Sequence, residues 1–189
     1  KIKGDDVRIE DASGNNIIKT VGSGSAELYE AGSKKLETTS TGVDITGTAV
    51  TDGVTVDGTL DIEEVVEKVE PSNSTTGTIS FDFLDQAIIN FTSDQTANRT
   101  INFRGNSSTA LNSMLSTNQS VTCSIVMKQG STAYYLNAYQ IDGSTVTPEW
   151  SGGSAPSAGN ASSLDVYTFT IIKTADATFT VLASQTQYA

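Results

Sequence analysis

Apolar and polar residues alternate in short runs along the second half of the chain. A period of two is typical of β-strands with one buried face. The number and spacing of these runs predict an all-β fold, with an antiparallel β-sandwich knob over residues 78–189 that is long enough to have its own core. The runs are Ile79/Phe81/Phe83, Ala87/Ile89/Phe91, Ile101/Phe103, Val121/Cys123/Ile125/Met127, Tyr135/Tyr139/Ile141, Tyr167/Phe169/Ile171 and Phe179/Val181/Ala183.

Residues 1–60 contain weaker strand patterns separated by turn formers. One hairpin is expected around residues 11–16 and a second around residues 31–33, where Asp, Asn, Ser and Gly gather. Both hairpins carry few apolar residues, so one chain has little with which to build a core. We therefore expect residues 1–60 to form a β-hairpin and β-repeat shaft that is intertwined with other copies of the chain.

A glycine-bracketed unit occurs twice in this region. The pattern G-V-x-I-x-G-T at residues 42–48 returns as G-V-x-V-x-G-T at residues 53–59, an offset of 53 − 42 = 11 residues. Each unit reads as a short strand that cannot bury its apolar face alone, but could do so when stacked with others. Two units fall short of a self-standing array, so chance matching in a segment rich in Gly, Thr and Val is the alternative.

Residues 61–71 have the pattern of a short amphipathic helix. Asp61 with Glu64 resembles a capping box, and Pro71 ends the segment. The apolar positions fall at i, i+3, i+4 and i+7, and are Ile62, Val65, Val66 and Val69. A helix this short is marginal in water and needs a partner surface. β-Branched residues at its core positions favour a coiled-coil-like trimer interface, and docking against the chain's own domain is the alternative. Residues 72–77 are polar and predict a linker.

Composition narrows the possible functions. The chain of 189 residues has 11 basic and 22 acidic residues, a net charge of −11, one cysteine and no histidine. Its acidity disfavours nucleic acid as a partner, and no apolar run is long enough for membrane insertion. The chain starts at Lys1 rather than Met, which leaves room for a preceding segment. Cys123 cannot pair within the chain and is expected to be buried.

The sequence contains few residue patterns that are typical of catalytic or cofactor-binding sites. Without histidine there is no Ser-His-Asp triad. Glycoside cleavage needs two carboxyl groups close together. The candidate pairs are Asp82 with Asp85 and Asp142 with Glu149. The commoner alternative is that these acids lie in loops and contact only solvent. Nucleotide-binding loops and EF-hand spacing are absent from the sequence. We expect no enzyme, no cofactor and no metal site.

Aromatic residues offer the better functional candidates. Trp150 lies in a loop rich in Gly, Pro and Ser, and Tyr134 and Tyr135 are adjacent. Together they could form a flat stacking surface for a sugar ring, which makes them candidates for receptor or glycan binding. The alternative is that Trp150 fills the sandwich core and one of the tyrosines faces inward.

Several segments in combination resemble structural proteins of cyanophages and other marine tailed phages. In the C-terminal part these are NFRG, TAYY, QIDG, VTPEWSGG, PSAGNASSLDVYTFTI and TFTVLASQT; upstream, SAELYEAGSKKLETTSTGVDITGT is similar to the repeat of their fibre-like N-terminal parts. The resemblance covers most of the chain. It implies a virion protein with a β-rich terminal knob, found as a homotrimer, and it supplies no catalytic residues.

These features together lead to a functional expectation. The chain is expected to be a trimeric tail fibre or spike component of a virion, joined to other virion proteins through its N-terminal part and attached to a glycan or protein of the host surface. Trimerisation would add avidity. A capsid or neck decoration protein with a purely structural role is the alternative, and a carbohydrate-degrading tailspike is a third class.

Overall fold

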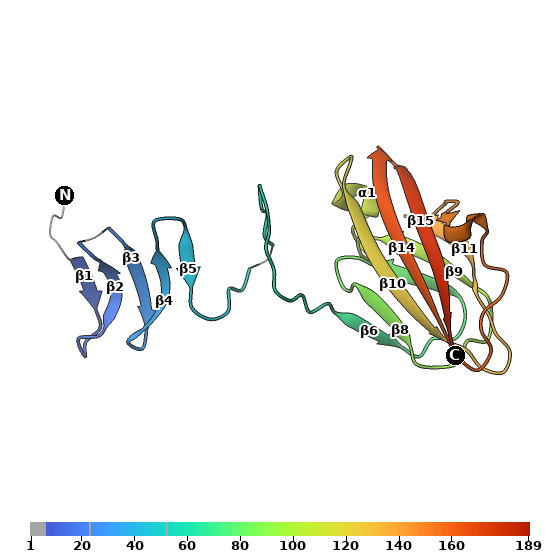
Figure 1. The fold of residues 1–189 in the computed structure, drawn as a ribbon, viewed down its shortest axis with the longest axis horizontal. Coiled ribbons are helices and arrows are strands. Elements are labelled where there is room, and N and C mark those ends of the chain that lie inside the picture. The colour runs from blue at the N-terminus through green and yellow to red at the C-terminus, as the bar shows by residue number, and fades with distance from the viewer. Residues whose placement is uncertain (1–6, 23, 52) are drawn as a thin grey trace. The chain divides into compact units, whose positions relative to one another are not determined.

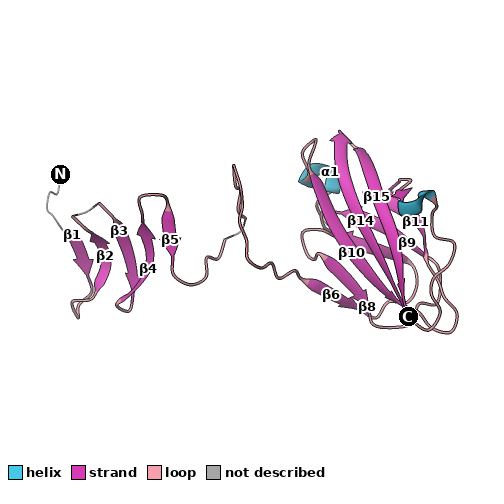
Figure 2. Ribbon diagram, in the orientation of Figure 1, coloured by secondary structure: helices cyan, strands magenta, loops and turns pink. Residues whose placement is uncertain are grey.

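The computed structural model describes residues 7–22, 24–51 and 53–189. The chain divides into two compact units, residues 1–61 and residues 62–189 (Figure 1). Strands dominate both units (Figure 2), which confirms the all-β expectation.

The N-terminal unit is one antiparallel sheet of five strands in the order β1-β2-β3-β4-β5. Both expected hairpins form in it. The first turn is held by the carboxylate of Asp11, which accepts hydrogen bonds from the backbone N–H groups of Ser13 and Asn15 at 2.8 and 2.9 Å. The second turn uses Gly32 at a φ of +75°, which favours glycine. The strands are β1 (Val7–Glu10), β2 (Asn16–Thr20), β3 (Ala26–Glu30), β4 (Ser33–Thr38) and β5 (Val43–Ile45).

The two glycine-bracketed units differ in structure. The first supplies β5, which pairs with β4. The described residues of the second unit, 53–59, form no strand. A self-standing repeat array is therefore not formed by this chain alone.

The helix expected over residues 61–71 is not formed. Residues 61–68 have no regular secondary structure, and Val69–Ser72 form the strand β6. Nucleating a short helix costs more than its few hydrogen bonds return. β-Branched Ile62, Val65, Val66 and Val69 also lower helix propensity. Without a partner surface, the capping-box pattern does not overcome these costs.

The C-terminal unit consists of two sheets. The six-stranded sheet has the order β13-β15-β14-β10-β8-β6, and the four-stranded sheet has the order β12-β11-β9-β7. The strands are β6 (Val69–Ser72), β7 (Thr78–Asp82), β8 (Ile88–Phe91), β9 (Arg99–Arg104), β10 (Ser120–Lys128), β11 (Leu136–Ile141), β12 (Ser144–Thr145), β13 (Glu149–Trp150), β14 (Leu164–Ala175) and β15 (Thr178–Tyr188). Two short helical segments interrupt them: α1 (Leu111–Met114) and the 3₁₀ turn η1 (Ser151–Gly153).

The expected antiparallel sandwich needs correction, because many of its strands are parallel. From β6 to β11 the chain alternates between the two sheets, so β6, β8 and β10 are parallel neighbours in one sheet, and β7, β9 and β11 in the other. Only the later strands β10, β14 and β15 form a long antiparallel ribbon. Parallel and antiparallel strands share the same period of two, so alternation alone could not separate them.

Residues 72–77 belong to the C-terminal unit and are not a free linker. Ser72 is part of β6, and the carbonyl oxygens of Ser74 and Gly77 accept hydrogen bonds from the guanidinium of Arg99 at 3.3 and 2.6 Å. Arg99 is 2% exposed and bonds Gln95 as well, at 2.7 Å. The segment therefore forms a fixed turn between β6 and β7, held by hydrogen bonds to Arg99.

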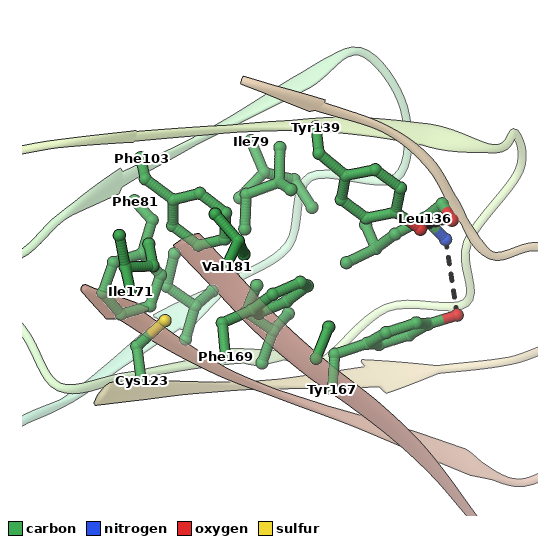
Figure 3. Packing of buried hydrophobic residues seen from close by; sticks show 14 of the residues in the cluster. Ile79, Phe81, Phe103, Cys123, Leu136, Tyr139, Tyr167, Phe169, Ile171 and Val181 are labelled. Carbon is green, nitrogen blue, oxygen red and sulfur yellow. Dashed lines mark hydrogen bonds between the residues drawn. The ribbon is translucent and has the colours of Figure 1, made fainter. Parts of the chain in front are cut away.

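The core lies between the two sheets of the C-terminal unit. Aromatic rings dominate it, and Phe103 meets Phe169 edge to face at 4.9 Å between ring centres. The hydroxyl of Tyr167 accepts a hydrogen bond from the Leu136 N–H (Figure 3). Cys123 is buried in the same cluster, as expected. All buried hydrophobic residues of the described ranges therefore lie in this unit.

Candidate assembly interface

An unbroken apolar row crosses all five strands of the N-terminal sheet. The strand register pairs each member directly with the next, which places all five side chains on one face. Apart from half-buried Leu36, the members are between 38 and 54% exposed. The apolar row consists of Ile9, Ile18, Leu28, Leu36 and Ile45.

The opposite face of the same sheet carries a charged row. Its members are paired across the strands in the same way, and are Arg8, Lys19, Glu27, Glu37 and Asp44. Lys34 reaches Glu27 at 3.6 Å and also pairs with Glu37. The hydroxyl of Tyr29 donates to Glu27 at 2.7 Å, and this bond, with the nearby lysines, holds the pKa of Glu27 below its ordinary value. The charged side chains of this face are therefore suited to contact with water.

The described residues of the N-terminal unit form no hydrophobic core. Among its described residues only Glu27 is buried, and it lies on the charged face. A sheet with one apolar face normally buries that face against a second layer. The apolar row therefore marks a surface that needs a cover, and it is the strongest candidate interface in the chain. Inspection of single strands does not reveal it, because it depends on the register between hairpins.

The residues expected to form the trimer interface are also exposed apolar residues. Ile62, Val65 and Val66 lie in the irregular segment before β6 and are 50, 64 and 90% exposed. Val69, at the start of β6, is 47% exposed. No helix brings the four together on one stripe, but each remains available to a partner.

Of the three aromatic residues expected at a glycan site, Trp150 has its ring contacts with other residues: among the described rings it meets Tyr139, Tyr167 and Phe169. Trp150 packs edge to face against core rings, with centres 5.5 Å from Tyr139 and 6.1 Å from Phe169. Tyr135 is half-buried against the same core. Tyr134 is held through its backbone, since its N–H donates to Gln129 at 2.9 Å. The structure therefore favours the alternative in which Trp150 fills the core.

A buried carboxyl group fixes the loops around Tyr134. Oδ2 of Asp165 accepts hydrogen bonds from Gln129 Nε2 at 2.9 Å and from the Asn160 N–H at 3.0 Å. The side chain is fully buried, and Oδ1 has no hydrogen-bond partner within the described part of the chain. Gly159 is needed beside it, because a Cβ there would lie 2.3 Å from the Tyr134 carbonyl oxygen. Burial raises the pKa of Asp165.

Asp165 predicts a specific pH dependence of stability. Because its pKa is raised on folding, it favours the folded state below the pKa of the unfolded chain, and this contribution is lost as the pH rises through the folded pKa. Asp165→Asn should remove that loss. Urea unfolding across pH 3–8 tests this: the difference in stability between variant and wild type should grow in the variant's favour with pH. A constant difference across the range would contradict the assignment.

One acid of each pair considered for catalysis has other partners. Asp82 forms an ion pair with Arg104, at 2.5 Å from Oδ1 to Nε. Asp142 accepts hydrogen bonds from the backbone N–H groups of Leu111 and Asn112 at the start of α1, at 2.7 and 3.0 Å. These contacts give Asp82 and Asp142 a structural role.

Within residues 7–22, 24–51 and 53–189, His, Cys, Asp and Glu side chains form no group of three or more that could hold a metal ion. In the same described ranges, no helix has the length and apolar character needed to cross a membrane.

Comparison of the chain with protein-family models, with curated proteins and with solved structures gives no match.

Proposed function

We propose that this chain is a virion structural protein of a tailed bacteriophage, a homotrimeric fibre or spike component. Its N-terminal unit forms the shaft and its C-terminal unit forms the knob. The apolar row of the N-terminal sheet carries this proposal, because a coreless sheet with one apolar and one charged face suits assembly around a common axis. The number of copies follows from the resemblance to fibre-like phage proteins.

The two faces of the sheet divide the roles within the shaft. Copies of the apolar row face one another at the centre, and the charged row faces solvent. The net charge of −11 helps to keep assembled particles apart from one another and from nucleic acid. Val50, Val54 and Leu60, which follow the sheet in sequence, are further exposed apolar residues.

The C-terminal unit is suited to presentation at the end of such a shaft. Its core is complete without help from other copies, so its loops and outer faces remain available for partners. Three knobs on one stalk bind a host surface glycan or protein with avidity. The N-terminal part joins the chain to other virion proteins.

Adsorption assays on intact particles test the attachment role. Fab fragments raised against the C-terminal unit are added to assembled virions before these meet their host. Loss of adsorption, with particle number and morphology unchanged, is the expected result. Unimpaired adsorption by virions saturated with Fab would contradict attachment and favour the decoration role.

A further inference from the structure

The six-stranded sheet of the C-terminal unit has an outer face without charge along three of its strands. The strands β10, β14 and β15 are neighbours (Figure 1), and alternate residues along them point away from the core. The outward positions are the even-numbered residues of 120–126, 164–172 and 180–188, all of them described, and each has an uncharged side chain. Together these positions form the uncharged face.

Charged residues lie at the margins of the uncharged face. Lys128 takes the outward position where β10 ends, and its ammonium group reaches Asp94 at 3.0 Å. Glu149 lies on the short edge strand β13, where it pairs with Leu182. The charges therefore stand at the rim of this surface and not at its centre.

The outer face of the four-stranded sheet has a different character. Its outward positions on β7 and β9 include Asp82 and Arg104, which form an ion pair at 2.5 Å. Asn102, also on this face, accepts a hydrogen bond from the Gly143 N–H at 2.9 Å. Charged and amide groups of this kind are suited to solvent. The lack of charge therefore distinguishes the uncharged face from the other outer face of the same unit.

Hydroxyl and apolar side chains share the uncharged face. The hydroxyls of Thr122 and Thr170 lie 3.2 Å apart across two strands, while Leu164, Leu182 and Tyr188 are 41, 44 and 52% exposed. A hydroxyl both donates and accepts, so an array of hydroxyls is able to pair with an identical array. The exposed apolar groups gain free energy when they are covered.

A second copy of the chain is the partner that this surface fits. Each copy has a net charge of −11, so copies repel one another wherever their carboxylates meet. A contact between copies therefore has to lie where carboxylates are missing, and the uncharged face meets this condition. A basic partner attracted by the acidic chain would need carboxylates to pair with, and the uncharged face offers none.

From these features we infer that the knobs of the proposed homotrimer pack against one another through the uncharged face, which is turned toward the common axis. The inference rests on the proposed association of copies. Three or four neighbouring strands about 4.8 Å apart are about 14 to 19 Å wide, and the side of a three-sided prism of that width lies about 4 to 6 Å from its axis. Facing sheets pack about 10 Å apart, which is about 5 Å from the plane between them. The width of the face therefore suits three copies.

The contact between knobs is weak without the shaft. The nine residues of β10, at about 3.4 Å each, give a length of about 30 Å, so the three strands cover about 400 Å² per copy. Stable interfaces bury about 800 Å² per partner. Copies already joined through their N-terminal units meet at a high effective concentration, so a small contact is enough to orient the knobs. The four-stranded sheet and its loops then remain on the outside, where a receptor has access.

Cysteine cross-linking of the full chain tests the inference. Thr168 lies at the centre of the uncharged face, between Ser124 and Ser184, and the inferred packing brings copies of Thr168→Cys together near the axis. Thr100→Cys is the matched control, because Thr100 is also a half-buried threonine on an inner strand but lies on the outer face of the other sheet. Each variant is oxidised or treated with a short bis-maleimide. Native Cys123 remains in both, because it is buried and burial strongly raises its pKa.

The expected result is a covalent pair of chains from Thr168→Cys and none from Thr100→Cys. Light scattering gives the solution mass of each untreated sample in parallel. A trimer that yields no covalent pair at position 168, or as much at position 100, overturns the inference and leaves the proposed function standing. A monomeric mass in the untreated wild-type chain overturns both.

Discussion

Ile18→Asp is expected to separate the assembled protein into single chains. Ile18 lies in the apolar row, paired with Ile9 on one side and Leu28 on the other. In a trimer the substitution brings three carboxylates to one apolar interface. Burying each without a partner costs about 3 kcal/mol or more, enough to weaken association by more than about a hundredfold. Sedimentation or light scattering of the purified variant gives the result.

Lys19→Asp is the matched control for this prediction. It introduces the same side chain at the next position of β2, on the charged face. It exchanges the ion pair with Glu27, at 3.9 Å, for two like charges on paired strands, a loss that acts on the sheet of each chain and leaves its apolar face unchanged. The control should keep the mass of the wild type. Equal behaviour of the two variants would show that the two faces of the sheet do not differ in their role.

Trp150→Ala is expected to destabilise the C-terminal unit. The Trp150 ring lies edge to face with Tyr139, Tyr167 and Phe169, at 5.5, 6.5 and 6.1 Å between centres. Its removal leaves a cavity beside the core and should lower the free energy of unfolding by about 3 kcal/mol. Chemical denaturation followed by circular dichroism measures the change.

Tyr188→Ala is the control for Trp150→Ala, because it removes an aromatic ring that lies outside the core. Tyr188 is half-exposed near the end of β15, so its removal should change the stability by less than about 0.5 kcal/mol. A Trp150→Ala variant as stable as the wild type, but unable to bind host cells, would contradict the core assignment and restore the stacking surface.

Strand positions and the core of the knob were predictable from sequence. Phe81, Phe103 and Phe169 alternate with polar neighbours, and all three are fully buried. The pairing of strands was not predictable in the same way. The strands from β6 to β11 alternate between the two sheets, and tertiary packing decides this order. The alternation of apolar and polar residues along each strand is the same whichever sheet the strand joins.

Segments with weak local preferences were the hardest to predict. Residues 61–71 satisfy a helical pattern, but their β-branched residues also suit an extended chain, and Val69 joins β6. Trp150 sits in a loop whose composition indicates exposure, yet Glu149 and Trp150 pair with β15 and the ring turns to the core. In both cases contacts distant in sequence decide the outcome.

The apolar row was only partly predictable from sequence. Counting outwards from the innermost strand pair beside the turns at residues 11–16 and 31–33 sets Ile9 opposite Ile17 and Leu28 opposite Lys35, whereas the structure pairs them with Ile18 and Leu36. The bulges near Glu10 and Tyr29 shift the register by one residue, and a residue-by-residue extrapolation from the turns misses them. The charged row on the other face follows from the same register.

The solution mass of the purified wild-type chain tests the central claim most directly. One chain has a mass of 19.8 kDa. Multi-angle light scattering should give three times this value, about 59 kDa, with little change on dilution through the micromolar range. A mass of 19.8 kDa at every concentration would contradict assembly through the apolar row.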